Sequence, residues 1–205
     1  MTAPRIMDYL CPTHVEVCRV RWPVPGNWSV LCDRCEACAA KREDLNSIKA
    51  LPYLTPAQHL LVQAIHEAGH ATAALSCGID LASVEIDEYG EGGYTTFADP
   101  AAAADAFALD RTTVLWAGQE AVDRWLAEKD VSTIANRVDA RFLAWHDAKE
   151  FDEMVAQKGL EVQHDWGASE ARLILAARWR YVSVLAAALA VHRRLSGHEI
   201  SAIVG

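Results

Sequence analysis

Beyond residue 38 the chain contains a single cysteine, Cys77, although it has 6 cysteines in all. It also lacks a long apolar run: the most apolar late stretch, residues 181–191, is shorter than the ~20 residues that span a bilayer, and arginines flank it. The N-terminus does not show the basic, apolar and small-residue pattern of a signal peptide. These absences predict a cytoplasmic protein without a membrane segment, whose clustered cysteines bind metal rather than form disulfides.

An excess of positive charge is missing as well. The net charge is −9, and it is uneven: residues 1–42 hold six Lys/Arg against four Asp/Glu, and the remainder holds 13 against 24. Such an acidic remainder argues against binding to nucleic acid, and the mildly basic first segment adds little support for it. A length of 205 residues fits one medium domain with a small appendage.

A His-Glu-x-x-His motif at residues 66–70 is the most informative feature that is present. In a helix, residues i and i+4 lie on the same face, so His66 and His70 can both reach one metal ion. Glu67 then lies beside the ion, where it can act on a water molecule. The pattern is typical of a zinc peptidase. The alternative, a core helix with incidental histidines, leaves buried polar groups without a partner.

The residues around this motif predict a buried helix over about 56–77. Apolar runs precede and follow the motif, which favours burial along most of the helix. Thr55 and Pro56 are suited to the N-cap and the first helical position, and Gly78 is suited to the stop.

The front end contains two pairs of possible metal ligands, each with two residues between its members. The pairs are Cys11 with His14, and Cys32 with Cys35. This spacing presents two ligands at a time to a tetrahedral ion, and the segment between the pairs is predicted to form a hairpin. A module of about 40 residues buries too little apolar surface to fold alone, so a structural zinc ion would stabilise it.

Cys18 and Cys38 are alternatives to His14 or Cys35 in this zinc-ribbon-like module, and free thiols are the remaining alternative. The module is predicted to cover residues 1–40 and a charged linker residues 41–55. The main domain would then cover residues 56–205. The module offers a surface for a protein partner, and its sequence does not choose among partner binding, nucleic-acid contact and stabilisation.

The main domain is predicted to be mostly α-helical with a small antiparallel β ribbon. Alternating residues predict strands over 82–86 and 93–97. Helical patterns follow over about 101–109, 111–127, 131–145, 148–157 and 168–195, with a short helix after residue 197.

In this region the chain resembles the protease domain of the FtsH family of AAA+ zinc proteases, over about residues 59–203. Residues 64–71 are similar to the zinc-binding helix of that family, and residues 84–86 and 93–97 to its following strands. Residues 109–121 resemble its Leu-Asp-Arg and Gly-Gly-Arg-x-Ala helix, with alanine for the first glycine and glutamine for the arginine. Residues 185–200 resemble its final helix and Leu-x-Gly-x-Glu-Ile end.

Two parts of that family have no counterpart in this sequence. No Gly-x-x-x-x-Gly-Lys-Ser/Thr loop occurs, and no membrane anchor is seen. ATP-driven unfolding of substrates is therefore not carried over. The resemblance implies an FtsH-like zincin domain that works without ATP.

The resemblance also implies a third zinc ligand, an aspartate at the start of a later helix with apolar residues one, four, seven and eight positions on. Asp147 fits at all four offsets, Asp130 fails at one and Asp165 fails at two. Asp147 is therefore preferred, with Asp165 and Asp130 behind it and an ordinary helix N-cap as the alternative role. Glu120 and Glu170 are lesser candidates.

Together these observations predict a zinc-dependent peptidase with one catalytic and one structural zinc ion. Glu67 would be the general base, and Gly93, Tyr94 and Thr95 would bind an extended peptide or protein substrate. The alternative is a non-catalytic zinc-binding adaptor that uses the front end to bind a partner. The sequence leaves the oligomeric state open.

Overall fold

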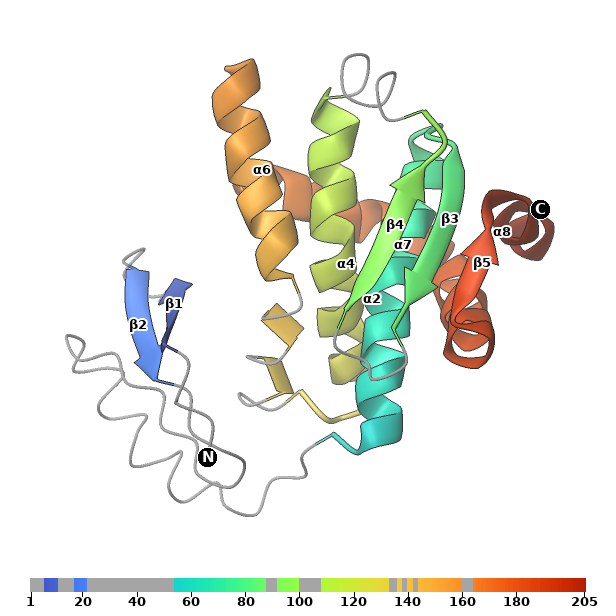
Figure 1. Cartoon of the computed structure of the whole chain (residues 1–205), viewed down its shortest axis with the longest axis horizontal. Helices are drawn as coiled ribbons and strands as arrows, with labels where there is room; N and C mark the ends of the chain where they lie inside the picture. The colour runs from blue at the N-terminus through green and yellow to red at the C-terminus, as the bar shows by residue number, and fades with distance from the viewer. Residues whose placement is uncertain are drawn as a thin grey trace. The chain divides into compact units, whose positions relative to one another are not determined.

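A computed structural model describes residues 6–10, 17–21, 54–87, 92–99, 108–132, 136–137, 140–141, 144–159 and 164–205. The chain divides into two compact units, Met1–Pro52 and Tyr53–Gly205. In the first unit, β1 (Ile6–Leu10) and β2 (Val17–Arg21) pair antiparallel (Figure 1). β1 precedes the first ligand pair and β2 lies in the segment between the two pairs, most of which is outside the described residues, so the hairpin predicted for that segment stays a prediction. A short connection joins neighbouring strands most simply as an antiparallel pair.

The ligand positions of the predicted structural zinc site lie outside the described residues. These positions are Cys11, His14, Cys32, Cys35 and the alternative Cys38. Cys18 lies in β2, opposite Tyr9 of β1. The structural zinc site therefore stays a prediction, as does the linker, of which only the last two residues are described.

The motif helix of the second unit, α2 (Pro56–Ser76), begins and ends close to the predicted positions. Thr55 is its N-cap: the Thr55 side chain accepts a hydrogen bond from the Gln58 backbone, and Gln58 Oε1 accepts one from the Thr55 backbone at 2.8 Å. This capping box satisfies two amide groups that the first turn leaves free. After the C-cap, Gly78 adopts a φ of +72°, which a residue with a side chain rarely adopts.

Two long helices cover α2, and a third lies beside one of them (Figure 1). α2 packs against α4 (Ala108–Glu128) and α7 (His164–His192), and α6 (Trp145–Lys158) packs on α4. Apolar side chains of the long helices and the sheet form one core, which includes Val62, Ile65, Val114, Leu126, Leu175, Leu185 and Val84. The middle of α2, with the motif, is therefore buried along most of its surface.

The helix boundaries differ from the prediction in several places, including the start of α7, which is His164 rather than a residue near 168. α4 is continuous from Ala108, so the predicted break near residue 110 is wrong; no glycine or proline lies there to cause one. Residues 131–132 are not helical, because Asp130 has a φ of 55° and turns the chain after α4. α7 has non-helical backbone angles at Arg178 and ends at His192 rather than near residue 195.

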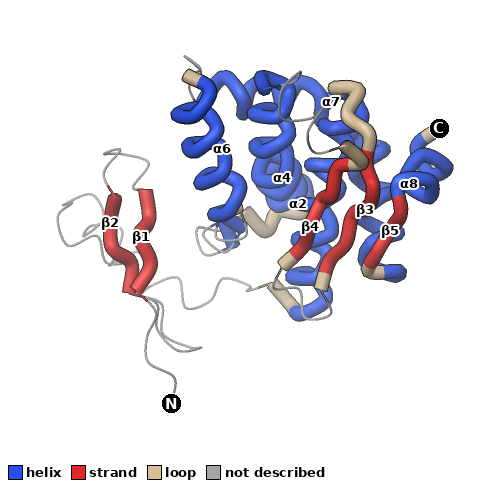
Figure 2. Tube along the Cα trace, turned by 45° about the horizontal axis from the view of Figure 1, so that its top comes forward, coloured by secondary structure: helices blue, strands red, loops and turns tan. Residues whose placement is uncertain are grey.

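The predicted two-stranded ribbon is a three-stranded antiparallel sheet. β3 (Leu81–Ile86) lies between β4 (Gly93–Phe97) and β5 (Arg194–Ser196), as Figure 2 shows. Arg193, with a φ of 63°, ends α7 and turns the chain, so that Leu195 is buried opposite Val84. A final helix, α8 (Gly197–Val204), starts at Ser196, which forms a capping box with Glu199. β4 is an edge strand of this described sheet.

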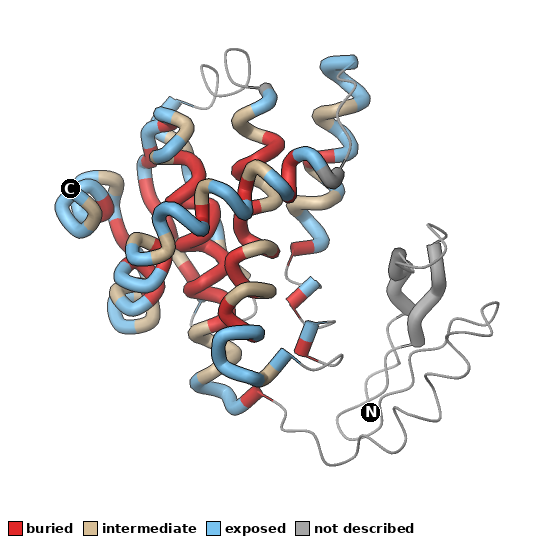
Figure 3. The backbone as a smooth tube through the Cα atoms, turned by 180° about the vertical axis from the view of Figure 1, so that it is seen from behind, coloured by how far each residue is buried: buried red, intermediate tan, exposed pale blue. Residues whose placement is uncertain are grey.

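One helical segment, Trp166–His192 in α7, is long and apolar enough to cross a membrane by length and composition alone. This segment is longer than residues 181–191, the most apolar stretch late in the sequence. Part of its surface is buried, including Leu175, Val182 and Leu189 in the core (Figure 3). Helices in protein cores can have the same length and composition.

Candidate metal centre

His66 and His70 lie one turn apart on α2, and both side chains are buried. Their rings meet edge to face with centroids 4.6 Å apart, and the two Nε2 atoms are 2.9 Å apart. The i and i+4 spacing of the motif therefore brings two imidazole nitrogens together, as the sequence predicts.

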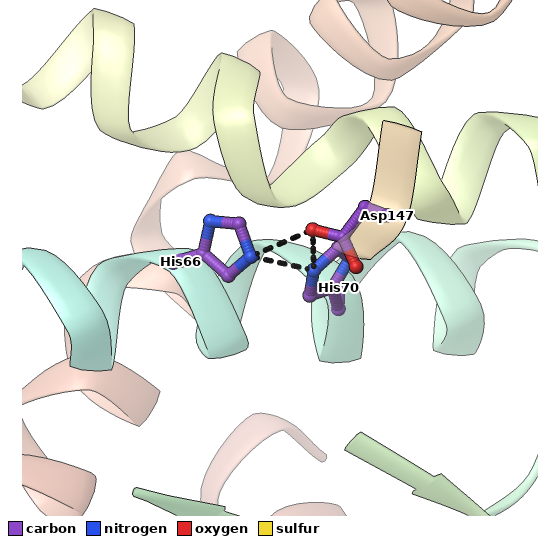
Figure 4. A group of neighbouring side chains, drawn as sticks. All are labelled: His66, His70 and Asp147. Atoms are coloured by element: carbon purple, nitrogen blue, oxygen red, sulfur yellow. Dashed lines mark hydrogen bonds and ion pairs between the residues drawn. The ribbon is translucent and has the colours of Figure 1, made fainter. Parts of the chain in front are cut away.

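Asp147 completes a group of three possible ligands (Figure 4). Its Oδ2 lies 2.9 Å from His66 Nε2 and 3.3 Å from His70 Nε2. Asp147 is in the first turn of α6, and the N-cap of that helix is Ala144. The alternative role of Asp147 as an N-cap is thus wrong, and its carboxylate points at the histidines instead.

The other candidates for the third position do not join this group in the part of the chain that is described. Asp130 is exposed beyond the end of α4. Glu120 forms an ion pair with Arg172, at 2.6 Å from its Nε, and Glu170 is absent from the group. The side chain of Asp165 lies outside the described side chains.

α6 holds Asp147 in place through its contacts with α4. Phe151, one turn after Asp147, is buried with its ring 5.8 Å from the ring of Trp116 in α4. Arg111 of α4 forms an ion pair with Glu150, and its guanidinium lies 5.5 Å from the centre of the Phe97 ring in β4. The positions one, four, seven and eight residues after Asp147 are the more buried ones, as the apolar offsets predict.

A backbone carbonyl of α4 orients one of the histidines. His70 Nδ1 donates a hydrogen bond to the Val114 carbonyl oxygen at 2.7 Å. Because a carbonyl can only accept, Nδ1 carries the proton and Nε2 is the nitrogen that faces Asp147. Histidines that bind metals are usually held in this way. His66 Nδ1, by contrast, is buried without a hydrogen-bond partner in the described part of the chain.

Gly118 of α4 allows both rings to approach that helix closely. A Cβ atom at this position would lie 2.5 Å from His70 Nε2 and 2.7 Å from His66 Nε2. Such separations are far below van der Waals contact. The absence of a side chain at Gly118 is therefore a condition for the convergence of the two nitrogens.

The charges of the three residues are coupled. Burial lowers the pKa of His70, but the charge of Asp147 and their hydrogen bond outweigh this effect and raise the pKa to about 9. Burial raises the pKa of Asp147, but the charge of His70 and hydrogen bonds from both histidines hold it well below its usual value. With no ion bound, the site is an imidazolium–carboxylate pair at neutral pH.

This pair predicts a pH-dependent affinity for zinc. Below pH about 9, His70 holds a proton that the ion must displace before Nε2 can bind it. We expect zinc binding at pH 7 to release about one proton, and the affinity to rise about tenfold per pH unit between pH 6 and 8. Calorimetry in buffers with different ionisation enthalpies measures the release. A pH-independent affinity would show that the pair does not form.

The three donor atoms fit a zinc ion. Zinc binds histidine nitrogens and carboxylate oxygens at about 2.0–2.2 Å in tetrahedral geometry, which separates neighbouring donors by about 3.3 Å. The separations of Nε2 and Oδ2 atoms, 2.9 to 3.3 Å, are close to this value. Two imidazoles and one carboxylate also leave a fourth position for water or substrate.

Glu67 is buried on α2 beside the ligand group but is not part of it. The Thr95 hydroxyl donates a hydrogen bond to Glu67 Oε2 at 2.9 Å. Gly93 lies so close that a Cβ there would be 2.6 Å from Glu67 Oε1. Tyr94, between them, is 74% exposed, since neighbouring residues of a strand point to opposite faces. Of the three residues predicted to bind substrate, two therefore contact the expected general base.

The sequence pointed to the ligands but missed the residues that position them. The Val114 carbonyl, Gly118 and the Arg111–Glu150 ion pair act from α4 and α6, far from the motif in sequence. Only Gly118, a glycine inside an otherwise regular helical pattern, gave a local signal of close approach.

Comparison with known proteins adds no relative: no family model matches the chain, and no curated protein matches it. The resemblance to the FtsH family thus depends on the motif and on the order of the later segments along the chain.

Proposed function

We propose that this chain is a zinc-dependent peptidase in which His66, His70 and Asp147 hold the catalytic ion and Glu67 is the general base. The observation that carries the proposal is the convergence of three donor atoms from two separate helices next to a buried glutamate that is not needed as a ligand. A site with a structural role alone has no use for that glutamate. The proposed hydrolysis needs no ATP, because none of these residues acts through a bound nucleotide.

Each residue has a separate task in this proposal. A bound zinc ion would polarise the scissile carbonyl and make a water molecule acidic near neutral pH. Glu67 takes the proton of the attacking water and gives it to the leaving amine. The Val114 carbonyl, through its hydrogen bond with His70 Nδ1, would keep His70 Nε2 turned toward the ion.

Peptide binding is assigned to the backbone of β4. This strand lies at the edge of the described sheet, and its inner face carries the two contacts to Glu67. An extended peptide can pair with such an edge and lie next to the motif helix. Tyr94 points away from Glu67, so its side chain is assigned no part in the chemistry.

A second candidate is the zinc-binding adaptor without activity. The deep burial of both histidines and Glu67, each at most 5% exposed, favours it, because a structural ion does not need access to substrate. In that case the front end would bind a protein partner. Nucleic acid is not favoured as the partner, given the acidic charge of residues 43–205.

Zinc analysis of the purified protein and of a His66→Ala/His70→Ala double variant tests the proposal first. We expect two ions in the wild type and one in the variant, together with loss of casein hydrolysis. If the variant keeps every ion of the wild type, the histidines hold no metal and the peptidase proposal is wrong. Loss of one ion from a protein that never cleaves casein or unstructured peptides would favour the adaptor.

Substitution of Asp147 tests the third ligand. Asp147→Asn keeps the size of the side chain but removes the charge that faces both histidines, so we expect the zinc affinity to fall about 100-fold or more. Asp130→Asn is the matched control and should leave the affinity unchanged, because Asp130 is exposed elsewhere. Competition with a chelator measures both constants. A loss of zinc affinity in Asp165→Asn rather than in Asp147→Asn would show that the third ligand is Asp165 of α7.

A further inference from the structure

The carboxylate of Glu67 is held by one strand of the sheet. Thr95 Oγ1 is 2.9 Å from Glu67 Oε2, and this contact is the hydrogen bond that the structure gives the carboxylate. A buried carboxylate is costly without such a donor. The bond also leaves Oε1 free of this donor.

Gly93 supplies the space for the same carboxylate. A Cβ at residue 93 would lie 2.6 Å from both Cγ and Oε1 of Glu67, so any side chain there would push the glutamate away. Gly93 and Thr95 are two residues apart, and residues two apart on a strand face the same side. Both therefore present the inner face of β4 to Glu67.

The pairing of β4 with β3 fixes the position of these two residues. Thr95 lies opposite Val84 and Gly93 lies opposite Ile86, and both partners in β3 are buried in the core. The hydroxyl donor is thus anchored to a strand whose partner is buried in the core, rather than to a loop.

We infer that Thr95 is a positioning residue for Glu67: its hydroxyl fixes Oε2 and so sets the orientation of the carboxylate that would take the proton of the attacking water, and Gly93 provides the room for this arrangement. The inference rests on the proposed function, because it assigns Glu67 the role of general base. It goes further by giving β4 a part in the chemistry that peptide binding does not include. Thr95 itself exchanges no proton with substrate.

The contact is first tested without metal or substrate. In the presence of a chelator, thermal unfolding is measured for the wild type, Thr95→Val, Glu67→Leu and the double variant. We expect Thr95→Val to lower Tm by about 5 °C when Glu67 is present, since the hydrogen bond between the two side chains is lost, and by much less when it is absent. Equal losses in both backgrounds would overturn the inference.

The role in positioning is then tested by kinetics on the zinc-loaded protein. Thr95→Val is expected to lower kcat about 10- to 100-fold with KM within about twofold, and Thr95→Ser, which keeps the hydroxyl, to restore most of the rate. Thr96→Val is the matched control, because Thr96 is exposed on the other face of the same strand. Its kcat should equal that of the wild type.

The two tests separate this inference from the proposed function. A wild type that binds zinc but cleaves no peptide refutes the peptidase, whatever the unfolding data show. An active wild type whose kcat is unchanged in Thr95→Val refutes the positioning role and leaves the peptidase standing. A loss in Thr95→Val that Thr95→Ser does not restore also counts against the hydroxyl.

Discussion

Glu67→Gln is expected to abolish peptide hydrolysis while the catalytic zinc ion stays bound. Glutamine has nearly the same shape, and its amide oxygen can still accept the hydrogen bond from Thr95. It cannot take a proton from water. Since general base catalysis contributes about 100- to 10,000-fold, a loss of that size is expected in kcat. Cleavage of casein or a labelled peptide and zinc content on the same preparation measure the two effects.

Glu153→Gln provides the matched control for this substitution. The substitution is again glutamate to glutamine, but on α6, where the Glu153 side chain is exposed and forms a surface ion pair with Lys149. Activity and zinc content should both equal those of the wild type. Full activity in Glu67→Gln would remove Glu67 from the mechanism, and loss of zinc would make Glu67 part of the binding site.

The same substitution distinguishes the peptidase from the adaptor. An adaptor that keeps zinc for structure should show no hydrolysis in either protein. Its affinity for a partner should also be unchanged by Glu67→Gln, because the glutamate is buried. A peptidase should lose hydrolysis in Glu67→Gln, and its thermal stability should stay close to that of the wild type.

The parts of the site that could be predicted are those encoded by local spacing. The i and i+4 histidines need only a helix, and Thr55 and Gly78 bound that helix in the sequence. Asp147 could be predicted because it is the candidate that matches, at all four apolar offsets, the pattern that the resemblance implies for the third ligand. The histidine spacing and the apolar offsets are each a pattern within one helix, so both can be recognised without knowing what packs against that helix.

The parts that could not be predicted depend on contacts between distant segments. β5 reads as the end of a helix in the sequence, and only the left-handed backbone of Arg193 and the pairing with β3 make it a strand. The sequence predicts Thr95 as a substrate-binding residue of an exposed strand and not as a partner of Glu67, because a strand pattern does not show which element lies beneath the strand. The register with β3 and the packing on α2 decide that.

Gly118→Ala is expected to abolish binding of the catalytic zinc ion and to leave the fold intact. The new methyl group would lie 2.5 Å from His70 Nε2 and 2.6 Å from His66 Cε1, which are the tips of two side chains. The rings can turn away from it, but their Nε2 atoms then no longer converge on one point. We expect the zinc affinity to fall at least about 100-fold. The Tm measured with a chelator should change little, since alanine favours the helix over glycine.

Gly69→Ala provides the contrast, because it places the same methyl group against a different kind of atom. A Cβ at Gly69 would lie 2.5 Å from the Ala117 carbonyl oxygen and 2.8 Å from the Ala121 Cβ, at the contact between α2 and α4. The backbone cannot turn away, so the two helices must separate and Tm should fall with or without zinc. Zinc titration and thermal unfolding of both variants distinguish the roles of the two glycines. Gly69 allows α2 and α4 to pack, and Gly118 allows the two histidine ligands to converge. A wild-type zinc affinity in Gly118→Ala would contradict the role of Gly118.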